Sequence, residues 1–196
     1  MIVGSELGKL FEEKTLASFE QVPGTEAALE AVRRWQRGER PWLVLLGPVG
    51  TGKTHLAIAL TKWYDDQHKI LVAGEPYNAA HVEFWTVPEF FEAMDRYQRE
   101  EKVSPFVRVL EADLVVLDDL GAENSSAEDR RGRWMLSKLH EIFDFRYRQK
   151  KRTIVTTNLT PEQLSKRYGD RLLSRMAEMG FCVAIEASDY RQRMTA

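Results

Sequence analysis

The residues best suited to chemistry lie in an eight-residue stretch, GPVGTGKT, from Gly47 to Thr54. It fits the pattern G-x-x-x-x-G-K-[S/T] of a loop that wraps the phosphates of a nucleoside triphosphate. Glycines suit this loop because its backbone N–H groups must turn inward, which requires φ values that other residues reach only with strain. The alternative is a glycine-rich turn before a surface lysine. The apolar strand sequence before the stretch and the helix-compatible sequence after it favour the phosphate loop.

This loop predicts a site for ATP and Mg²⁺. Lys53 is expected to reach the β- and γ-phosphates, and the Thr54 hydroxyl to ligate the magnesium ion that bridges them. The phosphates would rest on the N-terminus of the following helix. The residues predicted to bind the nucleotide are Gly47, Pro48, Val49, Gly50, Thr51, Gly52, Lys53, Thr54 and His55.

A pair of acids follows a second apolar run in DLVVLDD, residues 113–119. Such a run predicts a strand buried on both faces, whose carboxylates emerge at the sheet edge where α/β proteins bind ligands. We expect Asp118 to hold the magnesium ion through its water shell and Asp119 to polarise the attacking water. Alone, the pair fits equally well an ordinary strand that ends in a turn. Its position 65 residues after Lys53 favours the metal site.

Two weaker signals follow. The strand sequence RTIVTT ends at Asn158, whose amide could orient water beside the γ-phosphate or merely cap the next helix. Arg171 and Arg175 are four residues apart, so they share one helix face. An arginine supplied by a neighbouring subunit can complete a phosphoryl-transfer site, although a solvated basic helix is the ordinary reading of such a pair.

The elements that position these residues alternate between strand and helix, which predicts an α/β domain with a mainly parallel sheet. Residues 70–80 are hard to place, because Gly74 and Pro76 interrupt a short apolar run. Strands are expected at 42–46, 81–87, 114–117 and 152–157, and helices at 25–37, 53–65, 88–101 and 130–147.

Length and composition limit the alternatives. A chain of 196 residues with 43% hydrophobic content can form one full domain, with no room for a large second one. Its one cysteine, Cys182, excludes an internal disulfide or a cysteine-rich zinc site and favours a reducing compartment. No apolar run approaches the ~20 residues of a membrane span, and the N-terminus lacks a signal-peptide pattern. We therefore expect a cytoplasmic protein with no membrane partner.

Charge is distributed unevenly. The net charge is −2, but residues 130–196 contain 15 Lys and Arg against 7 Asp and Glu, a net charge of +8. The part before them therefore carries −10. A basic surface of this kind attracts phosphate backbones; alternatively, the acidic face docks on the basic face of another copy.

Taken together, GPVGTGKTHLA, LVVLDDLGAE, RTIVTTN, GDRLLSRM and ASDYRQR resemble the AAA+ ATPase module of bacterial replicative helicase loaders, the DnaC/DnaI family. The resemblance covers about residues 15–196. The phosphate loop and acidic strand are shared by many ATPases, whereas THLA, DDLGAE, TTNL and the terminal DYR are more specific. The transposition helper IstB is similar through the first half, and the initiator DnaA shares the ATPase parts.

The resemblance implies the three-layer fold of AAA+ P-loop NTPases, with a five-stranded, mainly parallel sheet in the order 5-1-4-3-2. Only about 20 residues follow Arg175, so no full C-terminal lid domain is expected. Residues 25–196 would form the ATPase domain and residues 1–24 an N-terminal segment with a docking role. The helicase-binding domain that precedes this module in such loaders would be absent or reduced to that segment.

For the site, the resemblance implies that Lys53, Thr54 and Asp118 bind Mg-ATP and that Asn158 is the sensor. Asp119 stands where AAA+ proteins usually have glutamate, so hydrolysis would be slow or dependent on assembly. Arg175 would be a finger that acts on a neighbouring copy, with Arg171 assisting assembly. The implied catalytic residues are Lys53, Asp119, Asn158 and Arg175.

Implied partners are a replicative DNA helicase, single-stranded DNA and further copies of the chain. Two alternatives stay open: an IstB-like transposition helper that binds duplex DNA, and a nucleotide-gated binding module with negligible turnover. Candidate DNA contacts are Arg96, Arg99, Lys102, Phe106, Arg108, Arg130, Arg131 and Arg133.

Overall fold

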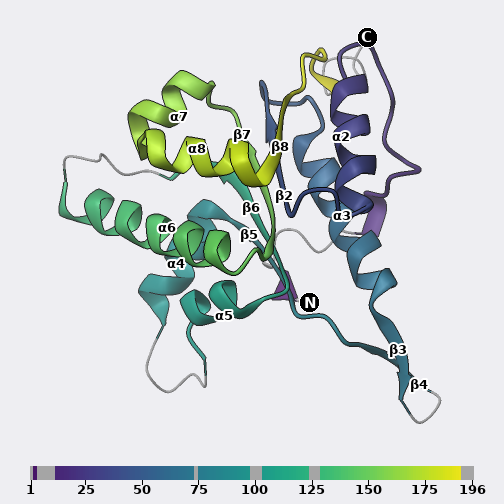
Figure 1. Cartoon of the computed structure of the whole chain (residues 1–196), viewed down its shortest axis with the longest axis horizontal. Coiled ribbons are helices and arrows are strands. Elements are labelled where there is room, and N and C mark those ends of the chain that lie inside the picture. The colour runs from purple at the N-terminus through teal and green to yellow at the C-terminus, as the bar shows by residue number, and fades with distance from the viewer. Residues whose placement is uncertain (1, 4–11, 73–74, 98–102, 124–128, 191–196) are drawn as a thin grey trace.

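The protein is described by a computed structural model that covers residues 2–3, 12–72, 75–97, 103–123 and 129–190. Figure 1 shows a central sheet with helices on both faces, the three-layer α/β arrangement expected from the sequence. The elements are β1 (Ile2–Val3), α2 (Glu26–Gln36), β2 (Trp42–Leu46), α3 (Lys53–Gln67), β3 (Lys69–Val72), β4 (Glu75–Asn78), β5 (Val82–Thr86), α4 (Val87–Arg96), α5 (Pro105–Glu111), β6 (Leu114–Leu120), α6 (Arg130–Arg148), β7 (Arg152–Thr157), α7 (Pro161–Tyr168), α8 (Asp170–Met179) and β8 (Gly180–Ala184).

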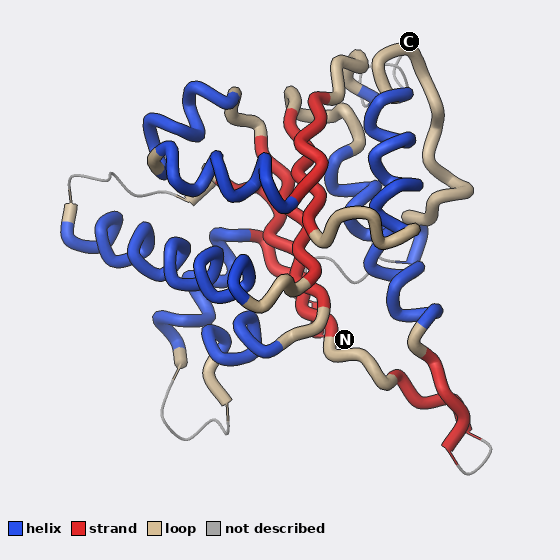
Figure 2. Tube along the Cα trace, viewed as in Figure 1, coloured by secondary structure: helices blue, strands red, loops and turns tan. Residues whose placement is uncertain are grey.

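The main sheet has the strand order β1-β5-β6-β7-β2-β8, with every recorded pair of neighbours parallel. Its five longer strands lie in the predicted order 5-1-4-3-2. The two-residue strand β1 beside β5 was not predicted. Because β2 and β6 occupy inner positions of one parallel sheet, the residues after both strands lie at the same edge (Figure 2).

Apolar residues of β2 alternate between two cores. Trp42, Val44 and Leu46 belong to the core under α4, α5, α6, α7 and α8, whereas Leu43 and Leu45 belong to the core under α2 and α3. Successive side chains of a strand point to opposite faces, so a strand covered on both faces is apolar throughout. This is why the sequence WLVLL reads as a continuous apolar run and still forms a strand.

The stretch that was hard to place, residues 70–80, forms most of an antiparallel hairpin. Strand β3 pairs with β4 in a separate two-stranded sheet that projects from the body beyond the end of α3 (Figures 1 and 2). Its apolar side chains are exposed, including Leu71 and Tyr77. The hairpin lies at the opposite end of α3 from the phosphate loop.

One arginine of the basic half is structural. Arg146 on α6 is fully buried and donates to the carbonyl oxygens of Val109 and Ala112 and to the Thr153 hydroxyl. Burial lowers the pKa of Arg146 to about 9, and the nearby Asp113 opposes this shift. The charge count of residues 130–196 therefore overstates the basic surface. In the described part of the chain, no helix combines the length and the hydropathy needed to cross a membrane.

Candidate nucleotide-binding site

The phosphate loop joins β2 to α3 and has the backbone that its glycines predict. Gly47, Gly50 and Gly52 adopt φ values of 142°, 79° and 93°. A Cβ on Gly52 would lie 2.7 Å from the Phe19 ring, and one on Gly50 would collide with the Asp189 carboxylate. The glycines are thus required both by their backbone conformation and by the two chain segments that pack against the loop.

Lys53 begins α3 and is held by the loop itself. Its ammonium donates to the carbonyl oxygens of Gly47 at 2.8 Å and Pro48 at 2.6 Å, and the residue is only 5% exposed. Burial lowers the pKa of Lys53, while Asp119 and Asp118 oppose the shift. The charge is therefore positioned inside the loop, where it can exchange carbonyl partners for phosphate oxygens.

Asp118 and Thr54 meet beside the loop, as predicted for a magnesium site. The Thr54 hydroxyl lies 3.1 and 3.0 Å from the two Asp118 carboxylate oxygens, and Asp118 is 2% exposed. Burial raises the pKa of Asp118 to about 6; the hydroxyls of Thr156 and Thr54 and the charge of Lys53 oppose the shift. A carboxylate and a hydroxyl are the oxygen donors that Mg²⁺ prefers, so this pair fits the ion.

Asp119 lies at an irregularity of the sheet. The pairing of β6 with β7 shifts register between Leu117 and Leu120, and Asp119 adopts a left-handed φ of 56°. Its backbone N–H donates to Thr156 Oγ1 at 2.9 Å, and the same hydroxyl donates to Asp118 Oδ1 at 2.6 Å. Thr156 therefore positions both acids. The sequence alone does not indicate this role, although Thr156 belongs to the TTN stretch that ends at Asn158.

These residues line one cleft with a volume of about 760 Å³, which is within the range of small-molecule sites. Of the predicted nucleotide-binding residues, those from Val49 to His55 line it, together with Asp118, Asp119 and Asn158. Gly47 and Pro48 contribute instead through the carbonyls that hold Lys53.

Two segments far from the phosphate loop in sequence complete this cleft, and sequence reasoning did not place them there. Phe19 and Val22 of the N-terminal segment lie in its wall, together with Thr25. Tyr190 lines it from the other end, and its backbone N–H donates to Gly50 O at 2.9 Å. This bond gives Tyr190 of the DYR stretch a structural role against the phosphate loop.

Arg171 and Arg175 converge on Asp144 of α6 rather than on the cleft. Arg171 Nη2 lies 3.2 Å from Asp144 Oδ2, and Arg175 forms an ion pair with Asp144 Oδ1. The Arg175 guanidinium also stacks 5.1 Å from the centre of the Tyr147 ring. The Arg175 side chain is 13% exposed and that of Arg171 71%. Neither arginine is among the residues that line the cleft.

Glu123, within DDLGAE, is a structural anchor. It is buried, accepts a hydrogen bond from the Tyr168 hydroxyl, and pairs with Arg167 at 3.1 Å. Its other oxygen accepts the Gly121 N–H at 2.9 Å. These contacts fasten the loop after β6 to α7, so this part of the motif holds the acidic strand end in place.

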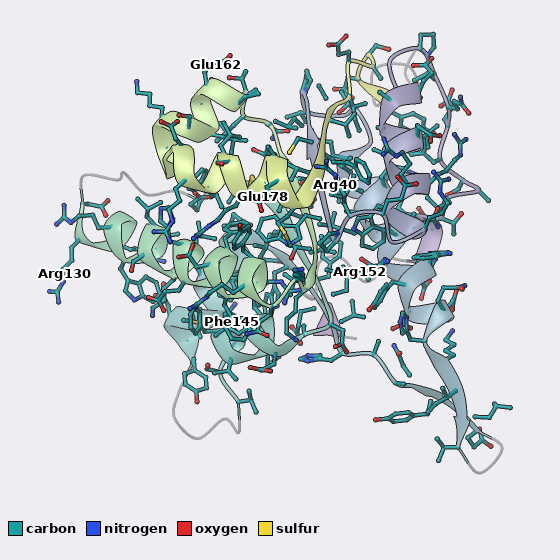
Figure 3. All side chains as sticks on the ribbon, viewed as in Figure 1. Arg40, Arg130, Phe145, Arg152, Glu162 and Glu178 are labelled. Atoms are coloured by element: carbon teal, nitrogen blue, oxygen red, sulfur yellow. The ribbon has the colours of Figure 1, made fainter. Side chains whose placement is uncertain are left out.

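The candidate DNA contacts differ widely in availability. Arg130 projects from the N-terminal end of α6 into solvent (Figure 3), and Arg131 pairs with Asp95 of α4. Arg96 is exposed at the end of α4, and Arg133 is exposed on α6. Arg99 and Lys102 lie outside the described residues.

Two of the candidates are occupied within the fold. Arg108 makes a bidentate pair with the fully buried Glu83, at 3.1 and 2.8 Å, and stacks on Trp85. Phe106 packs against the core and is covered by the ammonium of Lys138 at 4.6 Å. Both side chains are engaged within the fold, so the sequence expectation that they contact DNA is not kept for Arg108 and Phe106.

A family model described as IstB-like ATP binding protein matches residues 6–196 of this chain. The replicative helicase loader DnaC of Escherichia coli (strain K12) is 27% identical over 157 residues, which cover 78% of this chain and 57% of that relative. The chain spans about half the length of the curated relatives it matches.

Solved structures agree on the fold. A crystal structure of the DnaC helicase loader has a TM-score of 0.72 at 24% identity, covering 91% of this chain and 99% of that one. A structure of the replication initiator DnaA bound to AMPPCP and single-stranded DNA has a TM-score of 0.68 at 25% identity, covering 89% and 50%. This chain therefore has the AAA+ fold of these two proteins.

Proposed function

Since this chain belongs to the IstB-like ATP-binding protein family, we propose that it is an ATP-dependent loader of a replicative DNA helicase. ATP would bind in the cleft between the phosphate loop and residues 13–25. The observation that carries this proposal is the convergence of Lys53, Thr54, Asp118, Asp119 and Asn158 on one cleft of nucleotide size.

The residues of the cleft have separate roles in the proposed hydrolysis. Lys53 would bind the β- and γ-phosphates, and Thr54 and Asp118 would hold the magnesium ion. Bound Mg²⁺ would supply the charge that offsets the negative charge of the phosphates. Asp119 orients the attacking water and accepts its proton, and Asn158 positions the water near the γ-phosphate.

The site is proposed to be complete only between two copies of the chain. Arg175 of one copy would stabilise the charge that develops on the phosphates bound by its neighbour, with Arg171 contributing to the contact. The similarity to AAA+ proteins supports this assignment, and so does the position of both arginines outside their own cleft.

Single-stranded DNA is proposed to contact the surface formed by the exposed arginines Arg96, Arg130, Arg131 and Arg133 on α4 and α6. Positive charge on neighbouring helices attracts a phosphate backbone without reading its sequence. The similarity to the helicase loader DnaC supports the helicase as partner.

The second candidate function is an IstB-like transposition helper that binds duplex DNA, which the description of the matching family favours. A third is a nucleotide-gated module that binds ATP and barely hydrolyses it, for which the short carboxylate of Asp119 is the supporting feature.

The test measures ATP turnover by the full chain across a range of protein concentrations, with single-stranded DNA, with duplex DNA of equal length, and without DNA. A loader should turn over ATP more rapidly per protomer as concentration rises and as single-stranded DNA is added. It should also increase the amount of the replicative helicase from the same organism that is bound to single-stranded DNA.

The alternatives give different results. Stimulation by duplex rather than single-stranded DNA, without an effect on the helicase, would favour the transposition helper. ATP binding with turnover near background in every arm would favour the nucleotide-gated module. Failure to bind ATP at all would contradict all three.

A further inference from the structure

Residues 12–25 form a segment, here called the N-terminal strap, that contacts α3 at Lys62 through Glu12 and at His55 through Thr15 before it leads to α2. A compact turn starts it, in which the Thr15 N–H donates to Ser18 Oγ at 2.9 Å and the Ser18 N–H to Thr15 Oγ1 at 3.0 Å. Further along, Phe19, Val22 and Thr25 line the nucleotide cleft. The strap is therefore one wall of the proposed ATP site.

His55 joins this wall to the phosphate-loop helix. It follows Thr54 directly, and its Nε2 lies 2.8 Å from the Thr15 carbonyl oxygen and 3.3 Å from Ser18 Oγ. Burial lowers the pKa of His55, which favours the neutral ring, while the Thr15 carbonyl opposes this shift. Because a carbonyl only accepts, Nε2 must carry the proton that is donated to Thr15.

Phe19 extends the same contact to the loop. Its ring meets His55 edge to face, with 5.2 Å between ring centres and 85° between planes. The same ring approaches Gly52, where a Cβ would lie 2.7 Å from Phe19 Cε2. The His55 ring thus contacts the strap through one hydrogen-bonded turn and one aromatic side chain, both next to the loop.

We propose that His55 is a positioning residue that fastens the N-terminal strap to α3 and thereby completes the nucleotide cleft. The sequence suggested a direct nucleotide contact for His55; the geometry assigns it to the strap, through Thr15, Ser18 and Phe19. This assigns a specific task to the histidine of the THLA stretch. The nucleotide part of the inference rests on the proposed function, whereas the fastening of the strap does not.

The experiment compares His55→Ala, His55→Gln and the control His68→Ala, a histidine at the other end of the same helix whose Nδ1 contacts Tyr64 O. The first readout is the rate of trypsin cleavage after Lys14, which lies in the strap, measured without nucleotide. Cleavage inside an ordered segment requires local opening, so its rate reports how firmly the strap is held. The second readout is the Kd of a fluorescent ATP analogue with Mg²⁺.

We expect His55→Ala to accelerate cleavage after Lys14 and to raise the Kd about tenfold, the effect of losing one well-formed interaction. His55→Gln, whose amide can donate to the same carbonyl, should restore most of both properties. His68→Ala should match wild type in both. Phe19→Ala, which keeps the Thr15 bond, should raise the Kd as well.

If His55→Ala were cleaved after Lys14 at the same rate as the wild-type protein, the proposal would be overturned, because the strap would then be held without the histidine. Faster cleavage with unchanged nucleotide affinity would also overturn it, because the strap would not belong to the ATP site. Absence of binding in the wild-type protein would contradict the proposed function instead, and the cleavage readout would still decide the role of His55.

Discussion

The cleft and the arginine pair place their charges in different surroundings. In the cleft, Asp118 is buried with a pKa raised to about 6, and the nearest positive charge, Lys53, is held by loop carbonyls. On α6 and α8, by contrast, Asp144 already pairs with both Arg171 and Arg175. In the cleft, the buried carboxylate of Asp118 has no ion-paired arginine or lysine among the described residues. On α6 and α8, both arginines are already ion-paired with the carboxylate of Asp144.

This difference indicates what each region requires from outside. A buried carboxylate is costly, and a bound cation relieves that cost, so the cleft gains from Mg²⁺ and nucleotide. Arg171 is largely exposed, and an exposed pair is worth little, so moving Arg171 from Asp144 to the phosphate of another copy costs little, whereas Arg175, whose side chain is 13% exposed, leaves a more buried pair. In the proposed function, the cleft binds Mg²⁺ and nucleotide, and the arginine pair acts on another copy.

The largest effect on ATP turnover is expected from two variants, one that lacks a working cleft and one that lacks the arginine. Lys53→Ala and Arg175→Ala should each lower turnover by about 10³-fold or more, because each removes a charge that stabilises the transferring phosphoryl group. When the two variants are mixed in equal amounts, half of the copies have an intact cleft and the other half an intact arginine. Activity should therefore recover at roughly one quarter of the interfaces, those where an intact cleft faces an intact arginine.

Nucleotide affinity is the control for this experiment. Arg175→Ala should bind ATP like wild type, whereas Lys53→Ala should not. A mixture as inactive as its two components would contradict the sharing of arginines and would place the role of Arg175 within its own chain.

Asp118→Asn should lower turnover by about 10²-fold while making the free protein more stable. The pKa of Asp118 is raised from 3.8 to about 6 in the folded state, so the folded protein binds this proton more tightly than the unfolded chain. The protonated carboxyl of Asp118 therefore contributes to the free energy of unfolding below pH 3.8, and this contribution is lost as the pH rises to about 6. Removing the carboxylate should therefore stabilise the protein by up to about 3 kcal/mol above that range.

Thermal unfolding of both proteins without nucleotide or divalent ions, at a series of pH values, checks this sign. The difference in Tm between Asp118→Asn and the wild-type protein should be small near pH 4 and should grow between pH 4 and 7. An equal difference at every pH would mean that the loss of hydrogen bonds, rather than of a buried charge, determines the change in stability.

Asp144→Asn tests whether the pairing within one chain competes with the contact between chains. Without the carboxylate, both arginines are free to reach a neighbouring cleft, so half-maximal turnover should require roughly threefold less protein, matching the modest energy of a partly exposed pair. The matched control is Glu141→Gln, which breaks a partly exposed pair with Lys138 on the same helix. Lower turnover with an unchanged concentration dependence would show instead that Asp144 aims Arg175.

The sequence predicted the parts of the cleft that are local and missed those that depend on register. The phosphate loop has fixed spacing, and DLVVLDD and RTIVTT are recognisable strands, so the loop and the place of Asp118 followed from the residues, whereas the strand order followed from the resemblance to AAA+ ATPases. Thr156 is important only because β7 pairs with β6, which places its hydroxyl between Asp118 and the Asp119 N–H. The strap and Tyr190 return to the loop from opposite ends of the chain, and no local pattern indicates that.

The availability of basic side chains was equally hard to predict. Arg108 resembles any surface arginine in sequence, yet the buried Glu83, 25 residues earlier, binds its guanidinium. Arg131 pairs with Asp95 only because α4 lies beside α6. Whether an arginine faces DNA depends on carboxylates that the fold brings near it.

The smallest effect concerns Asp119, where glutamate is usual in AAA+ proteins. Its left-handed φ of 56° suits aspartate better than glutamate, so the bulge that turns this residue toward the cleft also favours the shorter side chain. Asp119→Glu should raise kcat about threefold, because the longer carboxylate reaches the water more easily, and lower stability by about 0.5–1 kcal/mol. Steady-state kinetics at saturating protein concentration and thermal unfolding measure the two effects. An unchanged kcat with lowered stability would mean that a step other than the attack of water, such as product release, limits turnover.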